Sequence, residues 1–352
     1  MKRKKMHFYF PISGPNNGVK IISTHILNHF LNDNYFNVRV VDTAQATGFS
    51  NFGKFNVNKL LLTLKLFSKL FKVKHKDLIY LNLTPKGFAF FRDFCMILIS
   101  KIKRGNITVH IHANELEKKI NPFTRRLLKG VKIIVINRLQ YNNLKPLHLN
   151  LFLVKNALPD FFRQPPYIRK FDKDKIKLLF FSNLSKQKGI FRLESMIRSI
   201  GNSDLDCEVN IYGGILDKFN ETIFLNLKTE YEFINYFGSI NDEREKYKAF
   251  QDNDFLLFLS DQNYEVSPLV FIEALMSGLP IITTKQVVSN EIIDQKCGYH
   301  ISDAPSELIS ILQNHRSTEF NYNELKLKCR KTYLEKYSFE NFMKEIKTII
   351  EK

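Results

Sequence analysis

The stretch that most constrains the fold of this chain is residues 254–284, which reads as strand, loop, helix and strand. Phe255–Leu259 is a short apolar run, as in a strand that is buried on both faces. Ser267 can cap a helix whose first turn holds Pro268, and Gly278 can end that helix. Two strands joined by a helix run parallel, so this unit predicts a parallel sheet with ligands outside the carboxyl ends of its strands.

Two glutamates lie in this unit, one in the loop before the helix and one inside the helix. A helix N-terminus attracts anions such as phosphate, so Glu265 and Glu273 need other partners. The paired hydroxyls of a sugar or a ribose suit a carboxylate, which accepts charge-assisted hydrogen bonds. Taken singly, Glu265 is also consistent with a helix cap, and Glu273 with a solvated helix residue.

The whole pattern EVSPLVFIEALMSGLPII, residues 265–282, resembles the signature of retaining glycosyltransferases of family 4, which have the GT-B fold. The resemblance implies that Glu265 contacts the donor sugar and Glu273 the ribose of the nucleotide. Val266 and Ser267, which follow the first glutamate, would belong to the same donor site. The family often has glycine where this chain has Val266, so the loop departs from the pattern there.

A second segment, Ser182–Gly189, stands between a predicted strand and a predicted helix. Lys188 beside Gly189 can hold a diphosphate, because glycine allows close approach of the backbone and the ammonium neutralises charge. A surface lysine is the plainer interpretation of this dipeptide by itself. Family members usually have an arginine five residues before the lysine. Asn183 stands there instead, so half of the cationic clamp is missing, and Lys186 or another base would have to replace it.

Two histidines mark the end of the predicted strand Ile107–Ile111. His110 and His112 share a side of the strand, since side chains alternate. The family often has a histidine here, at the wall of the active cleft, where an imidazole would hydrogen-bond the sugar or position the acceptor. His112 is the preferred candidate and is taken with Glu265 as catalytic. His110 stays open, and so does a histidine satisfied by a backbone carbonyl.

A glycine-bearing turn, residues 13–18, follows the first predicted strand, Met6–Ile12. Family members commonly have a glycine-rich turn here, which would place Gly14 at the donor site. A simple tight turn explains the same residues equally well.

Two series of strands that alternate with helices predict two doubly wound, Rossmann-like α/β domains. Residues 1–157 are expected to form an acceptor-binding domain and residues 176–337 a nucleotide-sugar-binding domain, with 158–175 as the linker. As in GT-B proteins, the tail 338–352 is expected to be a helix that crosses back and packs on the N-terminal domain.

Charge is placed unevenly along the chain. Residues 1–157 hold 27 Lys and Arg against 6 Asp and Glu, a net charge of +21, whereas the rest hold 26 against 29. The high positive charge of residues 1–157 indicates an anionic partner: a membrane surface, a nucleic acid or a phosphorylated acceptor. Lys54–Lys76 mixes leucine and phenylalanine with seven lysines and no acid. It predicts a helix that packs on a sheet, attaches to anionic lipid, or does both.

Four scattered cysteines favour a reducing compartment, and no apolar run reaches the roughly 18 to 20 residues that span a bilayer. The apolar part of the basic N-terminus is too short for a signal peptide. These features predict a cytoplasmic protein attached peripherally to the inner face of the cell membrane. No cluster of metal ligands is evident, because Asp204-Leu205-Asp206 lies in a polar turn. Neither a metal nor a cofactor is expected besides the nucleotide sugar.

The hypothesis that joins these features is a metal-independent glycosyltransferase with a nucleotide-diphosphate sugar as donor. Its expected acceptor is a bacterial cell-surface glycan or lipid-linked acceptor, and retention of configuration is implied by the resemblance alone. One alternative is a GT-B sugar-nucleotide epimerase, which needs no basic acceptor domain. Another is a basic nucleic-acid-binding protein, but the chain has no recognisable DNA or RNA motif, so no nucleic acid is expected. The sequence leaves open the donor sugar, the base, the acceptor, the linkage and the oligomeric state.

Overall fold

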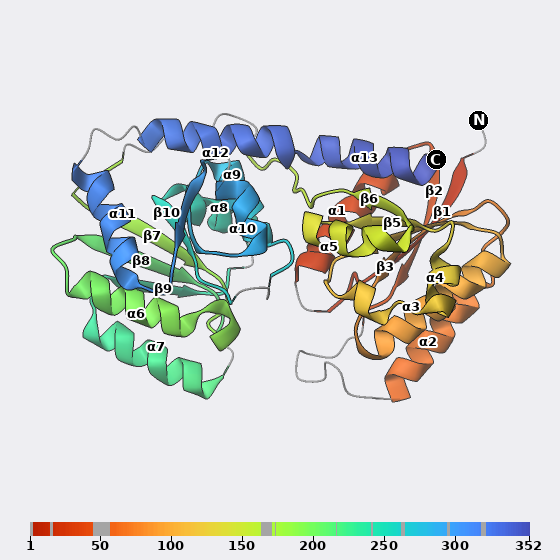
Figure 1. The fold of residues 1–352 in the computed structure, drawn as a ribbon, viewed down its shortest axis with the longest axis horizontal. Helices are drawn as coiled ribbons and strands as arrows, with labels where there is room; N and C mark the ends of the chain where they lie inside the picture. Colours follow the sequence, from red (N-terminus) through yellow and green to blue (C-terminus); the bar gives the residue numbers. More distant parts are fainter. Residues whose placement is uncertain are drawn as a thin grey trace. The chain divides into compact units, whose positions relative to one another are not determined.

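The structure, a computed structural model, describes residues 3–14, 17–44, 57–162, 171–172, 174–215, 217–240, 242–261, 265–293, 296–317 and 322–352. The chain divides into two compact units, Met1–Pro159 with Phe339–Lys352, and Asp160–Ser338 (Figure 1). Each unit is a parallel six-stranded sheet with helices on it, which confirms the predicted pair of Rossmann-like domains. Half of the predicted linker, at 163–170 and 173, lies outside the described residues.

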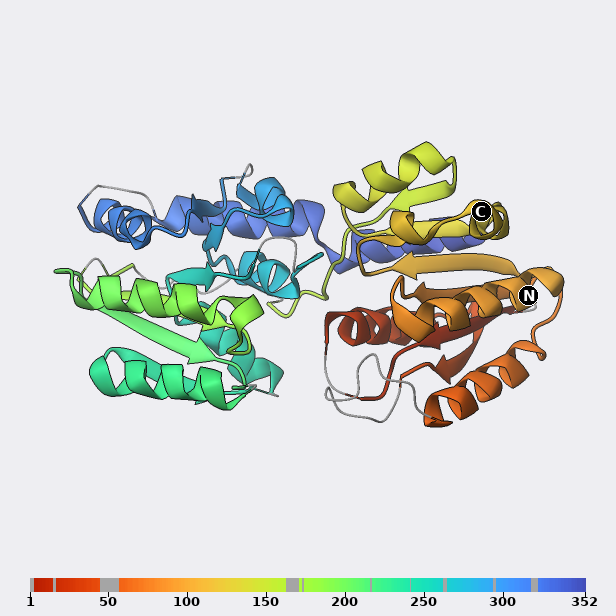
Figure 2. The same cartoon turned by 60° about the horizontal axis from the view of Figure 1, so that its bottom comes forward.

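The sheet of the first unit has the strand order β2-β1-β3-β4-β5-β6, and all of its neighbours pair in parallel. Its strands are β1 (Lys4–Phe10), β2 (Phe36–Asp42), β3 (Leu78–Leu83), β4 (Asn106–Ile111), β5 (Lys132–Val135) and β6 (Asn150–Leu153). Its helices are α1 (Gly18–Leu31), α2 (Val57–Leu70), α3 (Gly87–Ile102), η2 (Leu116–Lys119), α4 (Pro122–Leu128), α5 (Arg138–Leu144), η3 (Lys145–Leu147) and α13 (Phe339–Glu351). Helices α2 and α3 cover one face of this sheet, and α1 and α13 cover the other (Figures 1 and 2).

The C-terminal helix α13 is part of the first unit although it ends the sequence. Its apolar residues recur at helical spacing and are buried: Phe342, Met343, Ile346, Ile349 and Ile350. Two lysine contacts hold the helix: Lys132 Nζ donates to the carbonyl of Ile350 at 3.0 Å, and Lys347 pairs with Asp33 at 2.8 Å. The tail therefore packs on the N-terminal sheet.

The sheet of the second unit has the order β12-β11-β10-β7-β8-β9, again with parallel neighbours. Its strands are β7 (Ile176–Phe181), β8 (Cys207–Tyr212), β9 (Ile234–Gly238), β10 (Phe255–Phe258), β11 (Ile281–Thr284) and β12 (Gly298–Ile301). Its helices are η4 (Lys186–Lys188), α6 (Ile190–Gly201), α7 (Lys218–Glu230), α8 (Glu243–Gln251), α9 (Leu269–Ser277), α10 (Val287–Ile293), α11 (Pro305–Ser317) and α12 (Tyr322–Lys336). Helices α6, α7 and α11 lie on one face and α8, α9 and α12 on the other (Figure 1).

The start of α9 differs from the sequence-based prediction by one residue. Pro268, expected in the first turn, is the N-cap with φ −64° and ψ 120°, and no side chain caps the helix, so a Ser267 cap is wrong. The Pro268 carbonyl accepts from the N–H of Phe271 at 3.2 Å. Proline suits this position because an N-cap residue contributes its carbonyl to the helix and needs no N–H. At the other end, Gly278 takes a left-handed conformation with φ +73°, as predicted for a helix stop.

Candidate functional site

The candidate site lies where the strand order of the second sheet reverses. Strands β7 and β10 are neighbours, but the crossover from β7 leads to β8 on one side and that from β10 leads to β11 on the other. The loops that leave the carboxyl ends of β7 and β10 therefore diverge, and such a switch point is where open α/β sheets bind ligands. Both sequence motifs fall on these two loops: Lys188–Gly189 follows β7, and Glu265 follows β10.

The loop after β7 is folded tightly against β10. Ser185 caps the short helix η4, with its Oγ accepting from the N–H of Lys188 at 3.3 Å. Gly189 then turns the chain into α6 with a φ of +87°. A Cβ atom on Gly189 would lie 2.1 Å from the carbonyl oxygen of Leu259, so neither the backbone conformation nor the space allows a side chain. This glycine fixes the position of Lys188.

Lys188 and Glu265, which were predicted separately, form an ion pair. Both side chains are largely shielded, with 25% and 17% of their surfaces exposed. The acid therefore does not cap α9, as one interpretation of the sequence suggested. The structure places the proposed diphosphate cation and the proposed sugar-binding carboxylate in contact at the switch point.

Glu273 lies in the first half of α9 and is buried, with only 6% of its surface exposed. The interpretation as a solvated helix residue is therefore wrong. The carboxylate is paired with Lys246 of α8 at 2.7 Å. A buried carboxylate needs such a partner, because burying a charge without one destabilises the folded protein by on the order of several kcal/mol. No local pattern in the sequence marks Lys246, which is one of three basic residues on a helix of alternating charges.

Asn183, the residue in place of the family's arginine, is exposed and joins two loops. Its Oδ1 accepts from the N–H of Gly214 at 3.0 Å, next to a backbone bond from Leu184 N–H to the Gly214 carbonyl at 2.9 Å. The neighbouring Gly213 lies so close to this loop that a Cβ there would be 2.0 Å from the carbonyl oxygen of Ser182. Asn183 thus connects the loops that follow β7 and β8.

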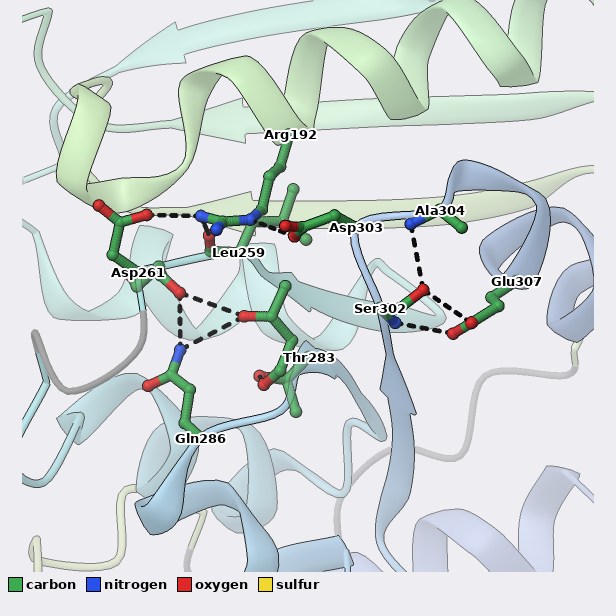
Figure 3. Close-up of polar contacts among 11 residues, drawn as sticks. Arg192, Leu259, Asp261, Thr283, Gln286, Ser302, Asp303, Ala304 and Glu307 are labelled. Carbon is green, nitrogen blue, oxygen red and sulfur yellow. Dashed lines mark hydrogen bonds and ion pairs between the residues drawn. The ribbon is translucent and has the colours of Figure 1, made fainter.

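Arg192 is a second residue that the sequence analysis missed, one helical turn after Lys188 (Figure 3). Its guanidinium pairs with Asp261 at 2.6 Å and with Asp303 at 2.5 Å, and it donates to the carbonyl of Leu259 at 3.3 Å. This fixes α6 to the loops after β10 and β12. Because both acids already neutralise it, Arg192 does not replace the missing arginine.

The loop after β11 is tied to the same place. Gln286, which is labelled in Figure 3, donates from Nε2 to the carbonyl of Ser260 at 2.9 Å. Thr284 Oγ1 donates to the same carbonyl at 3.1 Å. The loops after β10, β11 and β12 therefore form one hydrogen-bonded support around the carboxyl end of β10.

Val266 and Ser267 lie in a bend between Glu265 and α9, and both are half-buried. Val266 does not adopt a positive φ, so this loop does not require the glycine that the family often has. Residues 262–264, which precede the bend, lie outside the described part of the chain. With no side-chain cap on α9, the bend leads directly to a helix N-terminus.

In the first unit, His110 and His112 lie on the same side of the sheet, as predicted, with ring centroids 4.0 Å apart. His110 is fully buried, and its Nδ1 lies 2.9 Å from the hydroxyl of Tyr80. Burial lowers the pKa of His112 to about 4 and that of His110 well below its ordinary value, so both rings are neutral at pH 7. Within the described residues, Nε2 of each ring is buried without a hydrogen-bond partner. Two neutral imidazoles with an unused Nε2 suit contact with a hydroxyl.

The turn after β1 is described at Gly14 but not at residues 15 and 16. Gly14 has a φ of +81°, and its carbonyl accepts from Lys20 Nζ at 2.7 Å. Asn17 caps α1 through a bond from the N–H of Lys20 at 3.0 Å. Both interpretations of this turn, ligand loop and tight turn, fit these contacts.

None of the helices in the described part of the chain is long and apolar enough to cross a bilayer. In the same residues no three His, Cys, Asp or Glu side chains lie together so that they could hold a metal ion. Metal independence stays a prediction.

Comparison with known proteins defines the class. Residues 165–312 match the family described as "Glycosyl transferases group 1". A glycosyltransferase from Rickettsia africae has 14% identity and a TM-score of 0.73, with 99% of this chain and 98% of that one covered. The comparison with curated proteins found no match.

Two further structures have the same fold. WaaG, a glycosyltransferase involved in lipopolysaccharide biosynthesis, has 14% identity and a TM-score of 0.64 over 98% of this chain and 99% of that one. HepE from Anabaena, solved with UDP and glucose, has 15% identity and a TM-score of 0.69 over 99% of this chain and 100% of that one. At these identities the likeness shows the GT-B fold. With the domain match, it supports a nucleotide-sugar glycosyltransferase.

Proposed function

We propose that this glycosyltransferase moves a sugar from a nucleotide-diphosphate donor to a cell-surface glycan or lipid-linked acceptor, with retention of configuration and without a metal. The observation that carries the proposal is the contact between Lys188 and Glu265 at the switch point between β7 and β10. A cation for the leaving diphosphate and an acid for the sugar hydroxyls are the two groups that a donor site needs side by side.

The donor would replace the contacts seen in the ligand-free site. Lys188 turns from Glu265 to the diphosphate, which Gly189 allows to approach the backbone. Glu265 is then released to accept from hydroxyls of the sugar, and Glu273 accepts from those of the ribose. Val266 and Ser267 lie between the two acids and would line the sugar-binding part.

Catalysis without a metal needs another source of positive charge for the leaving group. Lys188 and the N-terminus of α9, which no side chain caps, would supply it. The acceptor proton would go to the donor's own phosphate, as is proposed for the retaining family that the sequence resembles. His112 would hydrogen-bond the sugar or position the acceptor hydroxyl.

The basic first unit supports an anionic acceptor held at the inner face of the membrane. Residues 1–157 carry a net charge of +21, whereas residues 158–352 carry a net charge of only −3. A phosphorylated or lipid-linked glycan matches this charge. WaaG, whose fold this chain shares, is named for lipopolysaccharide biosynthesis, which supports the same acceptor class.

A thermal-shift screen of nucleotide sugars tests the donor, because a ligand that binds only the folded protein raises the unfolding temperature. Turnover of the best donor with and without lipid-linked glycans then tests the reaction. Transfer that depends on the acceptor supports the proposal. Isomerisation of the donor without an acceptor would show the epimerase instead, and nucleic-acid binding at modest salt without any donor binding would favour the third alternative.

A further inference from the structure

Helix α3 carries an exposed apolar stripe, made of Phe88, Phe91, Cys95, Leu98 and Ile102. Steps of three and four residues place these side chains on one face of the helix. The exposed fractions are 40% for Phe88, 66% for Phe91, 41% for Leu98 and 71% for Ile102, and Cys95 is exposed too. Gly87 is the only other strongly exposed residue of α3, so none of the strongly exposed residues of this helix is charged.

The fold does not need this stripe. The opposite face of α3 packs into the core through Phe90, Phe94 and Ile97. The charged residues of the helix have partners of their own: Asp93 is 1% exposed and pairs with Arg92 at 2.7 Å, and Lys101 Nζ donates to the carbonyl of Lys129 at 2.6 Å. A soluble helix normally carries its charged residues on the outer face and its apolar ones inside. In α3 the outer face is apolar as well.

The surroundings of the stripe are basic. Helix α2 packs beside α3 (Figures 1 and 2) and exposes Lys65 and Lys69 together with Leu64, which is 56% exposed. Phe71, just after α2, is 62% exposed, with the ammonium of Lys103 lying 5.6 Å from its ring centroid. Helix α4, on the other side of α3, exposes Phe123, Arg125 and Arg126. Helices α2 and α4 contain no acid in their described ranges, and the one acid of α3 is buried.

We propose that the face formed by α2, α3 and α4 lies on an anionic lipid surface, with the α3 stripe below the headgroups and the surrounding Lys and Arg at the level of the lipid phosphates. An apolar strip bordered by basic side chains on a helix parallel to the surface is the arrangement of interfacial helices. Sixteen residues give α3 a length of about 24 Å, all of which can lie flat on such a surface.

Charge decides between a membrane and other occupants. A second copy of the chain would bring two strongly basic faces together, and like charges repel. An anionic membrane neutralises the same lysines and arginines and also accepts the apolar side chains. The inference deepens the peripheral attachment included in the proposed function, on which it rests. It adds insertion of α3 to the attachment through Lys54–Lys76 expected from the sequence.

The chain contains no tryptophan, so a single introduced indole reports on one position. Phe91→Trp places it in the stripe, and Phe219→Trp places it at a phenylalanine of equal exposure, 65%, on α7 of the second unit. With vesicles containing about one-third anionic phospholipid, Phe91→Trp fluorescence is expected to shift to shorter wavelength and to be quenched by lipids brominated on their acyl chains. The fluorescence of Phe219→Trp should not change.

A second measurement separates insertion from simple charge attraction. The double variant Phe91→Ser, Ile102→Ser should have a partition coefficient for these vesicles that is lower by about tenfold or more, since each substitution removes apolar surface from the interface. Phe219→Ser is the matched control and should bind as well as the natural chain. Neutral vesicles should bind weakly, and high salt should release the protein.

Two outcomes would overturn the inference. An unshifted Phe91→Trp spectrum on vesicles that do bind the protein would mean attachment through lysines without insertion. Absence of binding to anionic vesicles would assign the stripe to another partner, such as an acidic protein. Neither outcome depends on sugar transfer, which the donor screen tests separately.

Discussion

At the scale of single residues, each acid of the proposed donor site is paired with a lysine. Glu265 pairs with Lys188, and Glu273 pairs with Lys246. The two pairs differ in burial: the Glu273 side chain is 8% exposed and that of Lys246 19%, whereas the first pair is more open to water. The more open pair suits a contact that a ligand replaces, whereas the more buried pair is costly to break because either partner alone would be a buried, unpaired charge.

Comparison of the variants Glu273→Gln and Lys246→Met separates the role of Glu273 in the fold from its proposed role in donor binding. If Glu273 accepts from the ribose, the glutamine variant should lose affinity for the nucleotide by about 1.5 to 3 kcal/mol, the size of a charged hydrogen bond. Lys246→Met removes the same ion pair but keeps the carboxyl group, so it should lose less affinity for the nucleotide than Glu273→Gln does. Calorimetry on folded samples of both variants measures this. Equal losses would mean that Glu273 acts only through its contact with Lys246.

His112→Ala should lower the transfer rate with little change in donor affinity, because the ring belongs to the first unit and the donor contacts lie in the second. Steady-state kinetics with the donor and acceptor found by the screen provide the test. His110→Ala should affect the rate less, since its ring is fully buried and linked to Tyr80. An inactive His110 variant beside an active His112 variant would reverse the assignment.

Sequence reasoning selects candidate residues by local spacing. Lys188 and Glu265 became candidates because each lies between a strand and a helix, where parallel sheets bind ligands, and their roles stay predictions. Lys246 and Arg192 were missed because their importance comes from partners distant in the chain, Glu273 and Asp261, and no local pattern marks such contacts. The burial of Glu273 was missed for the same reason, because α12 packs on the helix that carries it.

At the scale of elements, strands with continuous apolar runs were predicted well. The predicted strands Ile107–Ile111 and Phe255–Leu259 agree with β4 and β10 to within one residue at each end, because both strands are buried in the interior of a sheet. Strand β12 was missed. Only Ile301 of its four residues is buried, so the edge strand has no apolar run to reveal it. The short helices α4 and α5 were also missed, since seven residues show barely two turns of periodicity.

The approach of α6 to β10 at Gly189 gives a prediction for packing between elements. Gly189→Ala should lower the free energy of unfolding by more than about 2 kcal/mol, because it combines a left-handed backbone with a clash against Leu259. Gly130→Ala is a matched control: its φ is +78°, but no atom lies within 4 Å of its added Cβ. That variant should lose only about 1 kcal/mol. Urea unfolding compares the two, and equal losses would contradict the close approach of Gly189 to β10.

At the scale of the whole molecule, the two units share a sheet architecture but differ in charge. The strand order reverses between β1 and β3 in the first sheet and between β7 and β10 in the second. Alternation of strands and helices was enough to predict both sheets. The order of the strands, and with it the location of the donor site, depends on which strands pair over long distances, and this was fixed only by the structure.

Stability should fall as the pH is lowered from about 6.5 to 4. Burial lowers the pKa of His112 and of His315 to about 4, whereas unfolded histidine titrates near 6.5. The unfolded chain therefore takes up protons first, and each such group costs up to about 1.4 kcal/mol per pH unit in this range. Asp93 acts in the opposite direction, because burial raises its pKa from 3.8 to about 6. The histidines together outweigh it.

Urea unfolding at pH 7 and at pH 5 measures this effect, with the transitions of the two units followed separately. His315→Gln should reduce the pH dependence of the second unit, where His315 is 4% exposed. Stability that is unchanged or higher at pH 5 would mean that these rings are not buried in their neutral form.

Lys188, beside Glu265 at the switch point of the second sheet, is the group proposed to hold the diphosphate of a nucleotide donor. Calorimetric titration with a panel of nucleoside diphosphates measures this, with the natural chain compared with Lys188→Met and, as control, with Lys228→Met at an exposed lysine of α7. We predict saturable binding of at least one nucleoside diphosphate by the natural chain and by Lys228→Met, and a loss of about tenfold or more in Lys188→Met, as for a charged contact. Equal affinity in all three proteins, or no binding by any of them, would contradict this role of Lys188.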